Sequence, residues 1–129
     1  MHADAEVAVV VGVGYAPALE LVDLSNDGAG AETVVATNIF HRAVAFGPLR
    51  TEVPASGSLI VNGDVRARAP VAELEERMRE AADVLAAVGE RFELGDRVIT
   101  GSVVQAPLQP GDEVTADFGL LGRVTLTVA

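Results

Sequence analysis

Three carboxylates near the start of the chain are the first side chains whose types and spacing could do chemistry. Residues 1–23 form two extended, mostly apolar runs around the glycine-rich connection 12–17. Because side chains alternate between the two faces of a strand, Asp4 and Glu6 share one face, and Glu20 points away from the leucines beside it. If the two runs pair in a suitable register, the three carboxylates meet in one small space. Such a cluster requires water, a shared proton or a hard cation, so a solvated acidic face and a metal site are both open.

His41 and Arg42 are the next two residues whose side chains could take part in catalysis or substrate binding. A histidine has a pKa near neutral and therefore suits general acid–base catalysis. The guanidinium of Arg42 could hold a substrate carboxylate through two hydrogen bonds. The alternative is that both are ordinary exposed residues of a short helix, because residues 38–46 show helical spacing of their apolar positions.

The composition excludes several chemistries. The chain has 129 residues, a net charge of −10 and neither cysteine nor lysine. Thiol nucleophiles, disulfides and thiolate metal sites are therefore excluded, as is Schiff-base formation by a lysine amine. The negative charge makes nucleic acid and anionic membrane surfaces poor partners. No apolar run approaches the roughly 20 residues of a membrane span, so we expect one cytoplasmic domain over residues 1–129.

The pattern of the chain favours an α+β fold that is mainly β. We predict short strands at 32–36, on both sides of Asn62-Gly63, and after each Gly-Asp turn of the last third, with a loop at 25–30. One principal helix is predicted over about residues 70–89, with Pro70 at its first position and Gly89 as its stop. Its apolar stripe is predicted to lie in the core and comprises Val71, Leu74, Met78, Ala81, Leu85 and Val88.

Residues 99–128, ITGSVVQAPLQPGDEVTADFGLLGRVTLTV, contain a Thr-Gly step, a Pro-Gly-Asp turn, a strand ending in Phe-Gly and a final strand after Leu-Gly. The acids lie in residues 3–12, ADAEVAVVVG, and in residues 17–23, PALELVD. In this order the three segments resemble the fumarylacetoacetate hydrolase superfamily, in particular its 2-oxopent-4-enoate hydratase and 4-oxalocrotonate decarboxylase branch. Residues 3–12 resemble the family's Glu-x-Glu strand, and residues 17–23 its third acidic segment. The resemblance covers nearly the whole chain and implies a β-roll or mixed sandwich of the family's C-terminal-domain type.

The resemblance also implies a site and its residues. The implied ligands of a Mg²⁺ or Mn²⁺ ion are Asp4, Glu6 and Glu20. In the family, the ion chelates a 2-oxo acid and stabilises the enolate formed during hydration, decarboxylation or carbon–carbon cleavage. The candidate catalytic residue is His41. The candidate substrate-binding residues are Asn38, Arg42, Thr100, Gly101 and Ser102, although the last three could equally form a plain turn between strands.

The chain departs from the family pattern in ways that bear on function. It resembles a shortened form, because the long N-terminal portion that precedes the Glu-x-Glu strand in the family is absent. Asp4 stands where the family usually has Glu, Phe40 stands where the family has serine, and the connection between Glu6 and Glu20 is short. The family's lysines have no counterpart.

Three functions remain open from the sequence. The first is a metal-dependent lyase, hydratase-like or decarboxylase-like, acting on a 2-oxo acid or an enolisable dicarbonyl. The second is a metal-free cyclisation or isomerisation in a biosynthetic pathway, on a scaffold whose apolar cavity is reused. The third is a non-catalytic binding subunit. We expect a homo-oligomer, a dimer or larger, or a partner chain that supplies the missing portion.

Overall fold

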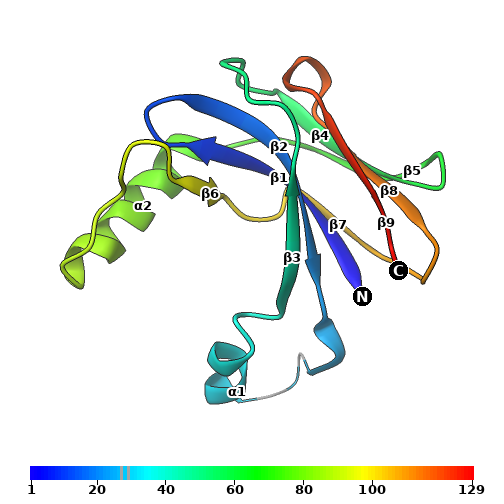
Figure 1. Ribbon diagram of the computed structural model, residues 1–129, viewed down its shortest axis with the longest axis horizontal. Helices are drawn as coiled ribbons and strands as arrows, with labels where there is room; N and C mark the ends of the chain where they lie inside the picture. The colour runs from blue at the N-terminus through cyan, green and yellow to red at the C-terminus, as the bar shows by residue number, and fades with distance from the viewer. Residues whose placement is uncertain (27, 29) are drawn as a thin grey trace.

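Two antiparallel sheets pack against each other to form the body of the molecule (Figure 1). The structure is a computed structural model that describes residues 1–26, 28 and 30–129. The first sheet contains β1 (His2–Val10), β2 (Gly14–Val22), β3 (His41–Phe46), β6 (Arg97–Ile99) and β7 (Val104–Pro107). The second sheet contains β4 (Ser56–Val61), β5 (Asp64–Pro70), β8 (Glu113–Asp117) and β9 (Arg123–Thr127). Strand order is β3-β2-β1-β6 in the first, with β7 also paired to β1, and β5-β4-β8-β9 in the second.

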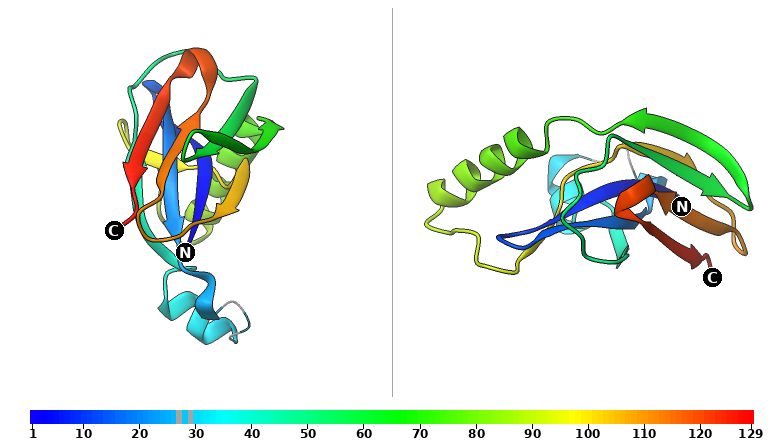
Figure 2. Two further views of the ribbon diagram at one scale, coloured as in Figure 1. Left: turned by 90° about the vertical axis from the view of Figure 1, so that its right-hand side faces the viewer. Right: turned by 90° about the horizontal axis from the view of Figure 1, so that it is seen from above.

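Two helical arms extend from this body (Figures 1 and 2). The principal helix, α2 (Leu74–Ala87), follows β5, and the short helix α1 (Ala31–Ala36) lies between β2 and β3. Single 3-10 turns, η1 (Leu24–Asn26) and η2 (Gly119–Leu121), follow β2 and β8. In the part of the chain that the structure describes, no helix has the length and apolar character needed to cross a membrane.

The core lies between the two sheets and is built from alternate residues of each strand. From the first sheet it takes Ala3, Ala5, Val7 and Leu19, which are fully buried. From the second sheet it takes Leu59, Val61, Val114, Ala116 and Val124, together with Phe118 and Leu121 just beyond β8. Because the strands alternate inward and outward, the inward apolar residues leave their polar neighbours on the outer faces. The predicted α+β, mainly β architecture with one principal helix is therefore confirmed.

The local predictions for strands and turns mostly hold. The hairpin around Asn62-Gly63 joins β4 to β5, and both glycine-aspartate turns of the last third precede strands. The predicted strand at 32–36 is wrong, because these residues form α1, where no residue is buried. A strand needs a neighbouring edge, and β-propensity without one does not decide the structure. The predicted loop at 25–30 includes Asp27 and Ala29, which lie outside the described residues.

The principal helix differs from its prediction in its start and in its packing. Pro70 ends β5 instead of starting the helix, which begins at Leu74. Gly89 follows the helix with a φ of 77°, as expected for its stop. The prediction that the apolar stripe lies in the core is wrong beyond Leu74, since Val88 is 71% exposed and the rest of the stripe is only partly buried. Helical spacing identifies an apolar face but not what covers it.

We predict that Phe118 carries a large share of the stability of the body. Phe118 is 2% exposed, and a Cβ on Gly57 would clash with its ring, so the site is tightly filled. Phe118→Ala should lower the free energy of unfolding by roughly 3–5 kcal/mol, measured by urea denaturation followed by circular dichroism. Leu120→Ala is the matched control, because Leu120 is 87% exposed. Equal losses in the two variants would contradict this assignment of the core.

Candidate metal centre and its pocket

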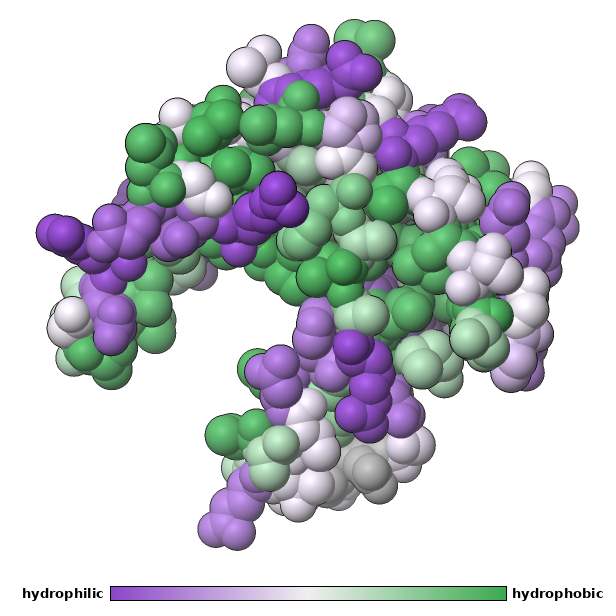
Figure 3. Space-filling model, viewed as in Figure 1, coloured by the Kyte–Doolittle hydropathy of each residue, from purple (hydrophilic) through white to green (hydrophobic). Residues whose placement is uncertain are grey.

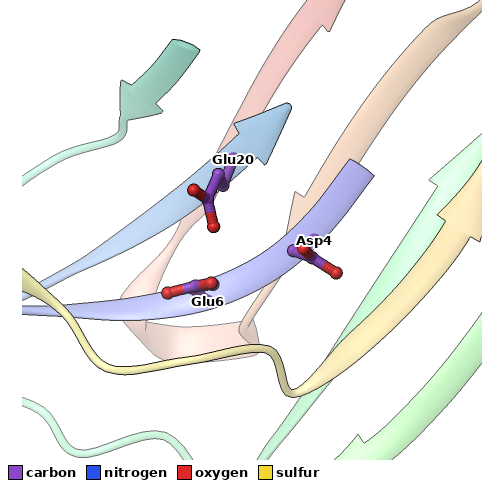
Figure 4. A group of neighbouring side chains, drawn as sticks. All are labelled: Asp4, Glu6 and Glu20. Atoms are coloured by element: carbon purple, nitrogen blue, oxygen red, sulfur yellow. The ribbon is translucent and has the colours of Figure 1, made fainter. Parts of the chain in front are cut away.

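The pairing of β1 with β2 brings the three predicted acids together on one face of the first sheet. Asp4 is paired directly with Glu20, and Glu6, two residues further along β1, is paired with Ala18. Directly paired residues of an antiparallel sheet share a face, as do residues two apart on one strand. One oxygen from each of the three carboxylates lies within 4.8 Å of the others (Figure 4). The cluster faces away from the second sheet and from the core.

The loop after β6 supplies hydrogen bonds to two of the acids. The Ser102 hydroxyl donates to Oδ1 of Asp4 at 2.9 Å, and the Gly101 N–H donates to Oε2 of Glu6 at 2.9 Å. Asp4 and Glu6 are 5% and 2% exposed, so these bonds are made inside the protein. The Thr-Gly-Ser step is thus a turn between strands and also a direct contact of the acidic cluster.

Thr100 and Arg77 hold this loop in place. The Thr100 hydroxyl donates to the Val7 carbonyl oxygen at 2.7 Å, which fixes the loop against β1. Nη1 of Arg77, on α2, donates to the Thr100 carbonyl oxygen at 2.9 Å. Thr100 therefore anchors the loop and does not line the pocket. Arg77 was not among the predicted site residues, because only the three-dimensional structure brings α2 to this loop.

Burial changes the protonation of the acids. The pKa of Glu6 is raised to about 8, chiefly because removal from water disfavours the ionised form. The neighbouring Glu20 contributes to this rise, and the hydrogen bond from the Gly101 N–H opposes it. Burial also raises the pKa of Asp4, although the bond from Ser102 opposes this. In the metal-free protein, a negative charge on Asp4 or Glu6 is therefore poorly compensated by its buried surroundings.

The donor set fits a hard divalent cation. Its side-chain donors are carboxylate oxygens from three residues, which is the ligand chemistry that Mg²⁺ and Mn²⁺ prefer. None of the arginines of the described chain forms an ion pair with Asp4, Glu6 or Glu20. A divalent ion would supply positive charge that no arginine of the described chain supplies to these acids.

His41 reaches the cluster through an irregularity in the sheet. Along the β2–β3 pair, Leu21 is paired with Ala43 but Val22 is paired with His41, so the register shifts at this point. A bulge of this kind changes which side chain points to a given face. Here it places Nδ1 of His41 2.6 Å from Oε1 of Glu20. The interpretation of His41 as an exposed residue of a short helix is wrong, because it begins β3.

Arg42 lies outside the pocket. Its Nη2 donates to Oδ2 of Asp23 at 3.1 Å, and its side chain is 48% exposed. A hydrogen bond from the Ser25 N–H is the largest cause that lowers the pKa of Asp23 to about 2, and the contact with Arg42 adds to it. The structure therefore brings His41 and Asn38 to the acidic cluster but not Arg42. Without the bulge, regular alternation along β3 would have placed Arg42, and not His41, on the same face as Glu20.

The acids form one end of an open cavity of about 580 Å³. Figure 3 shows a broad hollow between the arm that carries α2 and the arm that carries α1. The apolar side chains that line the cavity are Val22, Leu24, Ile39, Phe40 and Ile99. Gln105 also lines it, and it lies on β7 directly opposite Asp4. None of these was predicted as a site residue.

The segment between α1 and β3 has an unusual backbone. Asn38, Ile39 and Phe40 have φ values of 52°, 53° and 67°. Left-handed conformations cost roughly 1–2 kcal/mol per residue for side chains with a Cβ, and β-branched Ile39 is among the least suited to them. The turn is held by hydrogen bonds, among them one from the Asp23 N–H to the Phe40 carbonyl oxygen at 2.9 Å. Two of the five apolar residues of the cavity wall belong to this strained turn.

His2 is the first residue of β1. It is paired with Val22 and Pro107, and its Nδ1 is buried. His2 lies on the same face as Asp4, two residues away, and a positive charge on it favours the ionised form of Asp4.

Solved structures share this fold. Maleylpyruvate hydrolase from Sphingobium sp. SYK-6 is 22% identical, with a TM-score of 0.73 over 99% of this chain and 55% of its own. The 5-carboxymethyl-2-hydroxymuconate delta-isomerase from Mycobacterium smegmatis is 20% identical, with a TM-score of 0.72 over 99% of this chain and 58% of its own. A Yersinia pestis protein assigned to the fumarylacetoacetate hydrolase family is 22% identical, with a TM-score of 0.57 over 99% of this chain and 70% of its own.

These comparisons establish the fold. The chain spans little more than half the length of the first two proteins. No protein-family model and no curated protein sequence matches it. The predicted architecture of the fumarylacetoacetate hydrolase type is confirmed, and the reaction is a separate question.

We predict that the metal-free protein loses stability as the pH rises from about 4.5 to about 8. The pKa of Glu6 is raised from 4.5 to about 8 on folding, so in this window the folded state binds a proton that the unfolded state has released. The free energy of unfolding should therefore fall, by up to about 1.4 kcal/mol per pH unit for this group. Urea denaturation across the window measures the slope.

Glu6→Gln should flatten the slope, because glutamine does not titrate. Glu113→Gln is the control, since Glu113 is an exposed residue of β8. An unchanged slope in Glu6→Gln, or an equal change in Glu113→Gln, would contradict the assignment of the raised pKa to Glu6.

Proposed function

We propose that the protein is a divalent-metal-dependent enzyme, a lyase of the hydratase or decarboxylase kind, acting on a 2-oxo acid or an enolisable dicarbonyl. The observation that carries this proposal is the convergence of three carboxylates, two of them buried, at the end of a cavity of about 580 Å³. Buried carboxylates are stable only when they are paired, protonated or bound to a metal. The fold shared with a maleylpyruvate hydrolase and a 5-carboxymethyl-2-hydroxymuconate delta-isomerase supports an enzyme acting on a related substrate.

Asp4, Glu6 and Glu20 are the residues that would hold the ion. An ion bound there supplies a Lewis acid that polarises the 2-oxo group of the substrate. The Ser102 hydroxyl and the Gly101 N–H orient Asp4 and Glu6, and each does so through one 2.9 Å hydrogen bond. Residues in this orienting position commonly affect metal affinity nearly as strongly as the ligands do.

His41 is the residue that we assign to proton transfer. Its Nδ1 faces Oε1 of Glu20 at 2.6 Å, so a proton on Nδ1 leaves Nε2 as the basic nitrogen of the neutral ring. His41 also lines the cavity, so Nε2 is the atom that would take a proton from the substrate or return it. Asn38 and Gln105, which line the same cavity, supply amides for hydrogen bonds to substrate oxygens.

A metal-free isomerisation or cyclisation is the second candidate function. The observation that favours it is the raised pKa of Glu6, about 8, which keeps a carboxylic acid protonated at neutral pH. A protonated Glu6 and a basic His41 would form a donor and an acceptor around one substrate, as in enzymes that separate the pKa values of two neighbouring groups. Metal titration separates the two functions.

We predict that the protein binds Mn²⁺ through Glu6. Calorimetric titration should show binding heat, and the thermal midpoint should rise, since a ligand at 100 times its Kd stabilises by about 2.7 kcal/mol. Glu6→Gln removes one ligand and should weaken binding at least about tenfold. Glu113→Gln, which is the same substitution at an exposed position of β8, should bind as the unchanged protein does. Absence of both heat and stabilisation in the unchanged protein would favour the metal-free reaction.

We also propose that the protein self-associates through α2. The apolar stripe of this helix is only partly buried beyond Leu74, and Val84 beside it is 68% exposed. Figure 2 shows the helix extending from the body. Two copies can bury identical stripes against each other in a symmetric contact, which removes the same apolar surface from water twice. Arg77 of this helix also donates to the Thr100 carbonyl oxygen, so the position of the helix affects the loop that contacts the acidic cluster.

We predict that Leu85→Glu shifts the protein toward the monomer. A carboxylate in the centre of the stripe would have to be buried without a partner, which opposes association. Analytical ultracentrifugation over a range of concentrations measures the shift. Ala87→Glu is the control, because helical spacing places Ala87 on the opposite face of the helix. A protein that is monomeric before any substitution would contradict self-association and leave the stripe for a partner chain.

A further inference from the structure

The outer face of the second sheet carries a row of four polar residues that crosses all of its strands. Ser58 of β4 is paired directly with Arg68 of β5 on one side and with Asp117 of β8 on the other. Asp117 is paired in turn with Arg123 of β9. Directly paired residues of an antiparallel sheet share a face. The row therefore lies on the side of this sheet that faces away from the core, and the core separates it from the acidic cluster (Figure 1).

Both arginines of this row lean toward its centre. Nε of Arg68 donates to Oγ of Ser58 at 3.1 Å, and Ser58 is 6% exposed. From the opposite edge of the sheet, Nη2 of Arg123 lies 2.8 Å from Oδ2 of Asp117 in an ion pair. The Gly119 N–H donates to the other oxygen of Asp117, Oδ1, at 2.9 Å. Each guanidinium is thus oriented by a neighbour in the row, which lowers the entropy lost when a ligand binds to it.

Arg68 keeps hydrogen-bond donors that no group of the described chain uses. In that part of the protein its side chain makes one hydrogen bond, through Nε, and takes part in no ion pair. The two Nη groups of the guanidinium fork are therefore available to an acceptor. Asp117 already balances the charge of Arg123. The surplus positive charge of the row is therefore that of Arg68.

Three residues of the row line a cavity of about 600 Å³, namely Arg68, Asp117 and Arg123. This volume is within the usual range of small-molecule sites. The walls come from residues 52–56, before β4, and from residues 118–121, after β8. They include Val53 and Leu120, which are 61% and 87% exposed. A ring or a short chain in contact with these side chains would remove apolar surface from water.

We infer that this cavity is a second ligand site, which binds an organic carboxylate with an apolar ring or short chain. The carboxylate accepts hydrogen bonds from the Nη groups of Arg68 and from Arg123, and the apolar body contacts Val53 and Leu120. Hydrogen bonds between a guanidinium and a carboxylate are among the stronger ones in proteins. The inference does not depend on the proposed function, because it uses no residue of the acidic cluster or of its cavity.

Glu52 also lines this cavity and has the opposite effect on an anion. It is exposed, and within the described chain it forms no ion pair. Because like charges repel, its carboxylate weakens the binding of a carboxylate ligand. Removal of the charge of Glu52 and removal of the charge of Arg68 should therefore change the affinity in opposite directions.

Benzoate and benzamide form a matched pair of probes for this site. They have the same ring and nearly the same shape, and they differ in a carboxylate against a neutral amide. Each is titrated near neutral pH into the isotope-labelled protein with EDTA present, and the backbone N–H signals are followed by NMR. Benzoate should shift the signals of Gly119 and Leu121, with a Kd at least about tenfold lower than that of benzamide.

Three substitutions sharpen the test. Arg68→Gln should raise the Kd of benzoate at least about tenfold and leave that of benzamide unchanged. Its thermal midpoint should stay the same, because Arg68 is an exposed residue. Arg66→Gln is the matched control, since it removes the same charge at an exposed position of β5 that does not line the cavity. Glu52→Gln should lower the Kd of benzoate.

The outcomes that would overturn the inference are distinct from those of the metal titration. Equal Kd values for benzoate and benzamide would show that the ring alone sets the binding. An effect of Arg66→Gln as large as that of Arg68→Gln would assign the preference to net charge. Signal shifts confined to Gly101 and Ser102 would place the ligand at the acidic cluster, and weaker benzoate binding by Glu52→Gln would contradict the charge assignment. None of these results bears on whether Glu6 binds Mn²⁺.

Discussion

The register between β1 and β2 is the constraint on which the rest of the structure depends. It places Ala5 and Val7 in the core and, in the same step, puts Asp4 opposite Glu20 on the other face. Because the side-chain period of a strand is two, a slip of one residue would bury the acids between the sheets and expose the apolar residues. The same strand pairing therefore forms the core and brings the acids together, so no further interaction is needed to bring the three acids onto one face.

The segments around the cluster provide positions for the acids but little neutralising charge. The Thr100–Ser102 loop contributes one hydroxyl and one N–H to the buried acids, and Arg77 acts only on the loop's backbone. His41 reaches Glu20 because a bulge turns it inward and Arg42 outward. An arginine inside the cavity would have paired with one of the carboxylates and occupied its oxygens. Its exclusion keeps the carboxylates available for a cation.

Sequence patterns predicted the parts of the fold that depend on local rules. Alternation located β1 and β2, Asn62-Gly63 located a hairpin, and the three acids were assigned to one cluster. The patterns failed where tertiary context decides. The β-branched run at 32–36 has no sheet edge to join and forms α1, and the stripe of α2 has no covering layer within the described chain. The inward choice of His41 over Arg42 depends on a bulge, which no spacing rule locates.

The left-handed turn at Asn38–Phe40 explains why α1 and the bulge occur together. The chain leaves β2 at Val22, and within residues 23–40 it must return so that His41 can pair with that same Val22. The turn makes this reversal with three non-glycine residues at positive φ, and the Asp23 N–H ties its last residue back to the end of β2. A glycine would adopt these angles with less strain. Retaining Ile39 and Phe40 instead gives the cavity two of its apolar lining residues, at the cost of this strain.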